Sequence, residues 1–216
     1  MPSKSNSKDP SLLFETEAYE SGYAYFVGCD EVGRGAIAGP VAVGAALLRC
    51  PVEAFPEGLR DSKLLSEKKR ELMNNLVLEW VTASAVGFAS AAEIDEHGIT
   101  AMLGQAARRA LLDINAQGFP VNEALVLLDG SHDWLSPVLK TPLTVRTQVK
   151  ADQSCATVAA ASVLAKVARD EFMRQLDVDH PAYGWASNKG YGSAGHYDSI
   201  RAHGVTKWHR ASWIRT

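Results

Sequence analysis

The sequence AYFVGCDEVGRGAIAGPVAVGAALL, residues 24–48, decides the fold, because two short apolar runs flank a segment with two acids, one arginine and three glycines. Both runs contain Val, Tyr, Phe or Leu and have the length of β-strands. We therefore predict a two-stranded hairpin that ends at Arg49. Asp30 and Glu31 lie at the end of its first strand.

The adjacent carboxylates of Asp30 and Glu31 repel each other, which suggests a cation between them and a partner. A polar turn without a ligand is the alternative. Neighbours on a strand point to opposite faces, so Glu31 joins the site of Asp30 only if the chain bends, which Gly33 permits. The same glycines resemble a dinucleotide-binding loop. That loop should open a helix, whereas residues 40–48 have the pattern of a strand, and this disfavours a nicotinamide site.

The composition is that of one globular domain with a sizeable core: 216 residues, 46% hydrophobic and 22% charged, with a net charge of -3. Three scattered cysteines without zinc spacing are typical of a reducing, cytoplasmic location. No apolar run is long enough for a membrane span, and the N-terminus lacks the apolar core of a signal peptide. We therefore expect a cytoplasmic protein that does not bind membranes.

The remaining secondary structure follows from the apolar pattern and the capping residues. Residues 1–22 are polar and are predicted to form a flexible tail with a short docked turn at most. A helix is predicted over 66–80, capped by Ser66, with Leu72, Leu76 and Trp80 on one face, and a strand is predicted over 82–89. Ser90 and Glu93 predict a capping box, and the helix that follows over 100–117 carries Arg108 and Arg109 on its solvated face. The last predicted elements are a β-rich run over 141–149 and helices over 155–176 and 193–203.

Two further acids stand at the ends of predicted elements. The continuously apolar run ALVLLD (124–129) predicts a central strand buried on both faces and ending in Asp129. Two central strands that each end in an acid bring those acids to one edge of the sheet. Asp152 precedes the alanine-rich helix that Ser154 is predicted to cap, although an acid there also suits the helix dipole without a metal.

Together, Asp30, Glu31, Asp129 and Asp152 offer the oxygen ligands that Mg²⁺ and Mn²⁺ prefer. Two such ions can clamp a scissile phosphodiester. Ser62 and Lys63 lie in a loop before a helix N-terminus, where they can contact a phosphate, although a lone lysine in a loop is usually only solvated.

The C-terminal part, residues 181–216, interleaves aromatic and basic residues. From Lys189 onward, five Lys or Arg residues against one Asp give +4, and the whole chain carries -3, so the rest carries -7. A basic, aromatic region in an acidic protein is typical of a local nucleic-acid surface. The alternative is that many of these rings dock on the core.

These motifs, in this order, resemble the ribonuclease HII family of type 2 ribonucleases H. The resemblance spans about Tyr23 to Trp213. The matching segments are GCDEVGRG (28–35), DSKLLSEKKR (61–70), LLDG (127–130), KADQS (150–154), AAASVLAKVARD (159–170), NKGYGS (188–193) and HGVTKWHRASW (203–213).

The resemblance implies a ribonuclease H-like α/β fold: a mixed β-sheet flanked by helices over 23–180, with a small C-terminal helical subdomain over 181–216. It implies an endonuclease, dependent on Mn²⁺ or Mg²⁺, that cuts the RNA strand of RNA–DNA hybrids and cuts 5′ of single ribonucleotides in duplex DNA, leaving 3′-hydroxyl and 5′-phosphate ends. It assigns the metal to Asp30, Glu31, Asp129 and Asp152. It assigns the substrate to Gly33, Arg34, Gly35, Lys63 and Tyr191.

Gly33, Arg34 and Gly35 would read the ribose 2′-hydroxyl, and glycines allow such a close backbone approach. Ala36, Leu64 and Ala211 depart from the family pattern, and the last two replace basic residues. We expect a monomer, and the sequence identifies no replication-protein partner. The tail is too short for the extra domain of the type III relative. The alternative function is a non-catalytic module that binds RNA–DNA hybrids on the same fold.

Overall fold

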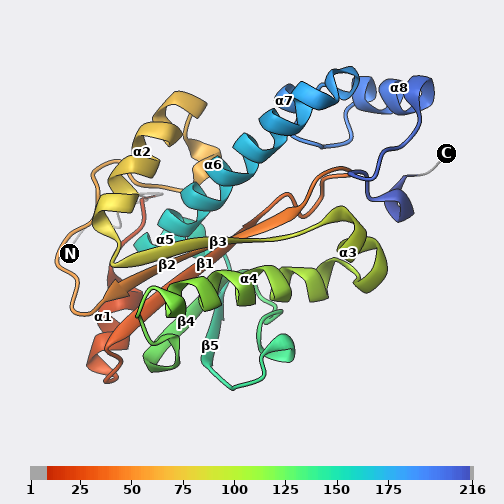
Figure 1. The fold of residues 1–216 in the computed structure, drawn as a ribbon. Helices are drawn as coiled ribbons and strands as arrows, with labels where there is room; N and C mark the ends of the chain where they lie inside the picture. The colour runs from red at the N-terminus through yellow and green to blue at the C-terminus, as the bar shows by residue number, and fades with distance from the viewer. Residues whose placement is uncertain (1–8, 215–216) are drawn as a thin grey trace.

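A computed structural model describes residues 9–214, which are organised around one five-stranded sheet (Figure 1). The strand order is β3-β2-β1-β4-β5. The hairpin strands β1 and β2 are antiparallel, as predicted, and so are β2 and β3, whereas β1, β4 and β5 run parallel. The strands are β1 Tyr25–Val32, β2 Val41–Arg49, β3 Ala83–Ala89, β4 Ala124–Asp129 and β5 Thr144–Gln148.

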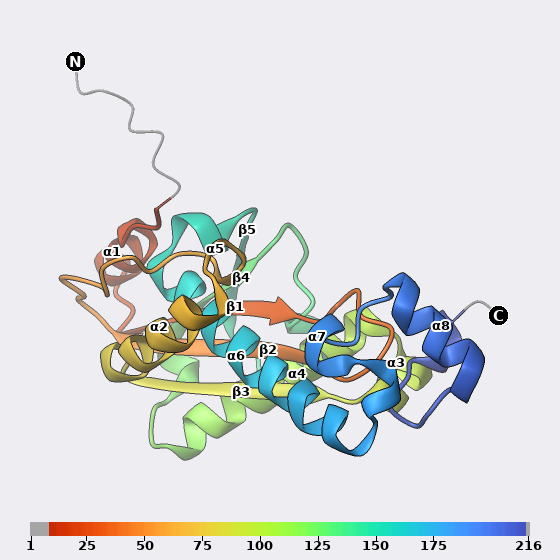
Figure 2. The same ribbon diagram turned by 90° about the horizontal axis from the view of Figure 1, so that it is seen from above.

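Helices cover both faces of the sheet. The long helix α6 packs across β1 and β2 with α2 beside it, and α4 covers the opposite face over β2 and β3 (Figures 1 and 2). The helices are α1 Leu13–Glu20, α2 Glu67–Trp80, α3 Ala91–His97, α4 Ile99–Ala116, α5 Ala151–Ser154, α6 Ala156–Asp179, α7 Trp185–Asn188 and α8 Ala194–His203. The predicted mixed sheet flanked by helices is confirmed.

The alanine-rich start of α6 lies unusually close to the sheet because glycines face it. A Cβ atom on Gly28 would lie 2.6 Å from the carbonyl carbon of Thr157, and one on Gly44 would lie 2.3 Å from the oxygen of Ala161. No side chain fits at either position. This face of β1 therefore carries Phe26, Gly28 and Asp30 toward α6, while the alternate residues face α4.

The predicted flexible tail over 1–22 is wrong for residues 13–20, which form α1; residues 1–8 lie outside the described residues. Glu15 is buried, and its Oε1 accepts hydrogen bonds from the backbone N–H and the hydroxyl of Thr157, at 2.9 and 2.5 Å. A carboxylate at the first turn of α6 complements the helix dipole. Ser154 is not the cap that the sequence predicts, because its hydroxyl donates to the Lys150 carbonyl.

The inner face of α2 also differs from the prediction. Leu72 and Leu76 are exposed, and Met73 and Val77 face the core instead. A leucine every fourth residue describes an outer stripe of the helix as well as an inner one, and contact with α6 decides between them. Trp80 is partly buried against this core, so the predicted face is wrong for the two leucines only.

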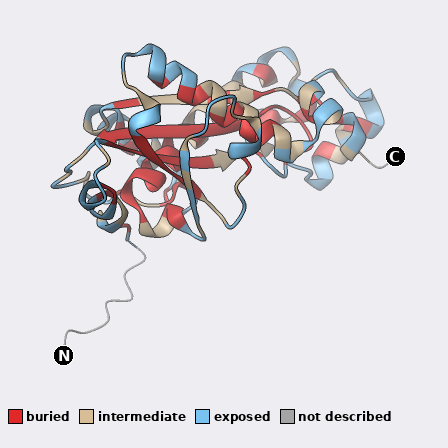
Figure 3. Cartoon of the chain, turned by 90° about the horizontal axis from the view of Figure 1, so that it is seen from below, coloured by how far each residue is buried: buried red, intermediate tan, exposed pale blue. Residues whose placement is uncertain are grey.

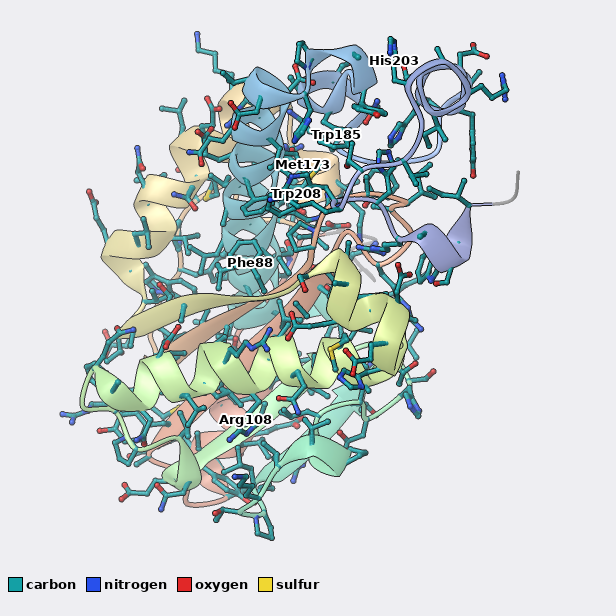
Figure 4. The ribbon with its side chains drawn as sticks, turned by 45° about the vertical axis from the view of Figure 1, so that its right-hand side comes forward. Phe88, Arg108, Met173, Trp185, His203 and Trp208 are labelled. Carbon is teal, nitrogen blue, oxygen red and sulfur yellow. The ribbon has the colours of Figure 1, made fainter. Side chains whose placement is uncertain are left out.

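The C-terminal part packs against the end of α6, beyond the end of the sheet at which β1 finishes (Figure 2). Buried Trp185 and Tyr183 stack with ring centroids 5.0 Å apart, and Trp185 lies beside Met173 of α6 (Figure 4). The strands β1, β2 and β4 are buried along most of their lengths, whereas the edge strand β5 and the C-terminal helices expose much of their surface (Figure 3). No helix within residues 9–214 combines the length and apolarity needed to cross a bilayer.

Candidate active site

The parallel pairing of the central strands brings two of the predicted acids together. Cys29 on β1 pairs with Leu128 on β4, so Asp30 and Asp129, the next residue on each strand, end at the same level. Asp30 is buried. The Asp129 carboxylate accepts a 2.7 Å hydrogen bond from the Ala151 N–H, which links the strand end to the short helix that carries Asp152.

Burial and mutual repulsion both raise the pKa values of Asp30 and Asp152. Burial raises the pKa of Asp30 well above its usual value, and the charges of Glu31, Asp129 and Asp152 raise it further, whereas Lys63 lowers it. Burial, Asp129 and Asp61 raise the pKa of Asp152 to about 6. Acids placed so that they resist ionisation favour a bound cation.

Glu31 approaches the other acids from the opposite face of the sheet. The strand continues regularly to Val32, so the bend expected near Glu31 is absent and its side chain starts on the α4 face, opposite Asp30. Its carboxylate lies 3.6 Å from Arg34. Burial raises its pKa, Arg34 opposes that shift, and Asp129 adds to it, so Glu31 belongs to the same electrostatic cluster.

The segment before α2 supplies a positive charge and a further acid. The Lys63 ammonium lies 3.6 Å from the Asp152 carboxylate and is otherwise exposed. Asp61, which the sequence analysis did not select, is buried beside Asp152, and its carboxylate accepts the Lys63 N–H at 2.9 Å. Ser62 is buried, and its N–H donates to Ser162 on α6. An acid two residues before the lysine that is predicted to contact phosphate is the signal that would have found Asp61.

The donor chemistry of this cluster fits a hard divalent cation, since it consists of carboxylate oxygens from separate elements that repel one another. Within residues 9–214, however, no three Asp, Glu, His or Cys side chains converge closely enough to hold one ion in this arrangement. A shared site therefore requires these side chains to change their orientation. The roles of Asp30, Glu31, Asp129 and Asp152 as metal ligands therefore stay predictions.

The glycine-rich loop that follows β1 is held from beneath by Arg169 of α6. Gly33 has φ +79°, and a Cβ there would lie 2.0 Å from the Arg169 Nε, so the position requires glycine. The Arg169 guanidinium donates to the carbonyls of Pro40 and Lys189 at 2.8 and 2.9 Å. Gly35 has open space around it and is exposed, which leaves its backbone accessible.

The turn that carries Tyr191 lies directly against this loop. The N–H groups of Ile37 and Ala38 donate to the Gly190 carbonyl at 2.9 and 3.1 Å. Tyr191 is 40% exposed, and the Arg169 guanidinium lies 5.7 Å from the centroid of its ring. Two of the predicted substrate-binding elements are therefore neighbours, although about 150 residues separate them in the sequence.

Comparisons with known proteins agree with this architecture. The family model described as Ribonuclease HII matches residues 27–216. A ribonuclease HII of Streptomyces avermitilis is 48% identical over 195 residues, which cover 89% of this chain and 78% of the relative. The crystal structure of ribonuclease H2 from Pyrococcus horikoshii aligns with a TM-score of 0.67 at 25% identity, over 88% of this chain and 93% of that one. A Bst ribonuclease HIII solved in complex with Mn²⁺ aligns with a TM-score of 0.71 at 24% identity, over 91% and 69%.

The fold is thus that of a ribonuclease H-like hydrolase, a mixed sheet flanked by helices with acids at the ends of its central strands. The chain belongs to the ribonuclease HII family. It is accordingly a ribonuclease H, an endonuclease that acts on RNA–DNA hybrids.

Proposed function

We propose that this enzyme cuts duplex DNA on the 5′ side of a single embedded ribonucleotide as well as the RNA strand of long hybrids. The reaction is two-metal-ion hydrolysis that leaves 3′-hydroxyl and 5′-phosphate ends. The observation that carries this proposal is the chain arrangement at the ends of β1 and β4. Asp30 and Asp129 end at the same level there, the loop with the exposed Gly35 follows β1 directly, and the turn that carries Tyr191 is hydrogen-bonded to that loop.

Asp30, Asp129 and Asp152 would hold Mn²⁺ or Mg²⁺, with Glu31 joining from the opposite face of β1. Divalent ions held there would lower the pKa of the attacking water and offset the charge on the leaving oxygen. Burial first, and then repulsion from neighbouring acids, raises the pKa of Asp30, which supports this assignment because a bound cation offsets both effects. The Mn²⁺ complex of the structurally similar ribonuclease HIII supports the choice of ions.

The chain's own residues would orient the substrate. Lys63, whose ammonium already lies 3.6 Å from Asp152, would bind the phosphate beside the scissile bond. Ser62, with its backbone tied to Ser162, keeps that lysine in place. Backbone groups of Gly33, Arg34 and Gly35 would hydrogen-bond the ribose 2′-hydroxyl, which distinguishes RNA from DNA.

Tyr191 would stack on the deoxyribose that follows the ribonucleotide, and so sense the junction. Its exposed ring is backed by the Arg169 guanidinium, which limits the positions that it can occupy. Stacking on a deoxyribose requires a sugar without the 2′-hydroxyl, so the ring and the glycine loop would read two consecutive sugars.

The test is cleavage of a labelled DNA duplex with one ribonucleotide, in Mn²⁺, in Mg²⁺ and in chelator, with an all-DNA duplex as the control. The expected result is a metal-dependent cut on the 5′ side of the ribonucleotide only. Cleavage of a long hybrid without that cut would remove the junction-sensing role. Binding of both substrates without cleavage of either would favour the non-catalytic hybrid-binding module.

A further inference from the structure

Three chain segments interlock beneath the surface that would read the sugars: the loop over 33–40, the turn over 188–193 and the segment over 206–210. Ala38 forms a β-bridge with His209, and the N–H of Gly39 donates to the Trp208 carbonyl at 2.8 Å. His209 and Arg210, two consecutive residues, are both buried. The His209 side chain reaches the turn through His196, and the Arg210 side chain contacts the loop.

Arg210 contacts the loop through carbonyls alone. Its Nη2 donates to the Gly33 oxygen at 2.7 Å and its Nη1 to the Arg34 oxygen at 2.8 Å, with Gly39 as a third acceptor at 3.2 Å. Within residues 9–214, no carboxylate lies at ion-pair distance from this guanidinium. Burial, with Arg169 nearby, lowers the pKa of Arg210 to about 9. Such a group stays buried only because its donors are satisfied.

These bonds orient the two peptide groups that would meet the 2′-hydroxyl. In a planar trans peptide the N–H points opposite to the C=O. Because the carbonyls of Gly33 and Arg34 point down at Arg210, the N–H groups of Arg34 and Gly35 point away from it. Neither N–H has a hydrogen-bond partner among the described residues. Arg210 thus aims two unused donors outward.

His209 contacts the turn through a relay of neutral rings. Its Nδ1 accepts the Thr206 N–H at 2.9 Å, so its Nε2 carries the proton and faces the His196 Nε2 at 3.2 Å. His196 Nε2 also accepts the Trp185 indole N–H at 3.0 Å, so His196 donates from Nδ1 to the Tyr191 carbonyl at 2.9 Å. Each ring nitrogen thus acts either as a donor or as an acceptor, and the last donor in the relay, His196 Nδ1, holds the backbone carbonyl of Tyr191 from behind.

We propose that His209 and Arg210 are positioning residues that set the selectivity for an isolated ribonucleotide. This rests on the proposed sugar-reading roles of Gly33–Gly35 and Tyr191. His209 and Arg210 are joined by one peptide bond. Because one holds the turn and the other holds the loop, this bond also sets the distance between the two outward N–H groups and the Tyr191 ring. A long hybrid offers a 2′-hydroxyl in every register, whereas an isolated ribonucleotide offers only one. Cleavage at an isolated ribonucleotide is therefore the more sensitive to misplacement of the loop or of the tyrosine ring.

The first test separates the two hydrogen bonds of His209 with near-isosteric variants. Gln at 209 keeps a donor at the position of Nε2, so His209→Gln should retain the wild-type ratio of cleavage at one ribonucleotide to cleavage of a long hybrid. His209→Asn keeps only the acceptor for Thr206. It should lower that ratio about tenfold, because the relay to Tyr191 is lost. Equal ratios in the two variants would overturn the role of His209.

The second test replaces the fork of Arg210 with a point charge. Arg210→Lys reaches one carbonyl instead of three, so the ratio should fall tenfold or more. Arg109→Lys is the matched control, because Arg109 also donates to a backbone carbonyl, that of Phe88, and pairs with Glu93, but among the described residues makes no hydrogen bond to the loop, the turn or the segment over 206–210. The control should leave the ratio unchanged. An equal loss on both substrates in Arg210→Lys would reduce Arg210 to a structural role.

Amide hydrogen exchange gives a readout that does not involve substrate. Arg210→Lys and His209→Asn should speed exchange at Ile37 and Ala38, which bond to Gly190, and leave the β1 amides unchanged. Unchanged exchange at Ile37 and Ala38 would overturn the proposal. Failure of the proposed function would give a different result. Tyr191→Ala and the wild type would then have the same ratio of cleavage at one ribonucleotide to cleavage of a long hybrid, while the faster exchange at Ile37 and Ala38 in the two variants would still be observed.

Discussion

The acid cluster at the ends of β1 and β4 and the buried cluster behind the sugar-reading surface solve opposite problems. At the acid cluster, buried carboxylates resist ionisation, and the two positive charges that oppose this shift, on Lys63 and Arg34, are themselves exposed. Behind the loop, two buried guanidiniums and two neutral imidazoles have backbone or ring partners for their donors. The first region is destabilised by repulsion that a bound cation would offset. In the second region the hydrogen bonds are already made, so it is rigid without a ligand.

The largest expected effect breaks the acid cluster alone. Asp129→Asn keeps the oxygen that accepts the Ala151 N–H, so the fold should be retained, but it removes a charge needed to hold a cation. Cleavage of a long hybrid should fall by about 10³-fold or more, measured as kcat/KM. Asp113→Asn, at an exposed acid of α4, is the control. An active Asp129→Asn enzyme would remove this residue from the metal site.

The two regions should also titrate in opposite directions in chelator. The pKa of Asp152 is about 6 in the folded state and 3.8 unfolded, so its contribution to stability is complete below pH 3.8 and is lost as pH rises through 6. The pKa of His209 is lowered to about 4 from 6.5 by burial, then by His196 and His180, while Thr206 opposes the shift. Its contribution is complete above pH 6.5 and is lost as pH falls through 4.

Urea unfolding between pH 4 and 8 checks both signs. Relative to wild type, Asp152→Asn should gain about 2 kcal/mol of unfolding free energy as pH rises across this range. His209→Gln should instead lose about 2 kcal/mol relative to wild type over the same rise. Parallel curves for the three proteins would show that neither group is coupled to folding.

A smaller effect concerns stability at neutral pH. Asp30→Asn removes a buried carboxylate whose pKa is raised by burial and by Glu31, so it should stabilise the metal-free protein at pH 7 by about 1–2 kcal/mol while reducing activity. Chemical denaturation in chelator measures this. Destabilisation by this variant would mean that other bonds of Asp30 outweigh the repulsion.

The smallest expected effect lies in selectivity. Tyr191→Ala should lower cleavage at an isolated ribonucleotide about tenfold more than cleavage of a long hybrid, because the loss of one stacking ring costs on the order of 1–3 kcal/mol. Tyr191→Phe keeps the ring and should retain the wild-type ratio. Parallel initial-rate assays on the two substrates provide the measurement. Equal losses on both substrates in Tyr191→Ala would count against junction sensing.

The sequence predicted the strands well because their signals are local. The apolar runs before Asp30 and Asp129 are continuous and end in an acid, and such runs form buried strands wherever they pack. The capping box of Ser90 and Glu93 is also confirmed, with both reciprocal bonds present. Arg109, expected on a solvated face, instead pairs with that Glu93, because α3 folds back onto α4.

The amino-acid order by itself determined the fold class, the family and the acids at the strand ends, since periodicity and motif order lie along the chain. Only the tertiary structure decided that Glu15 caps α6, that Glu31 starts on the face opposite Asp30, and that Asp61 lies beside Asp152. It also decided that His209 and Arg210 serve two different segments. Each of these depends on partners up to 177 residues apart, and the pairing of polar groups at that separation leaves no local pattern to read.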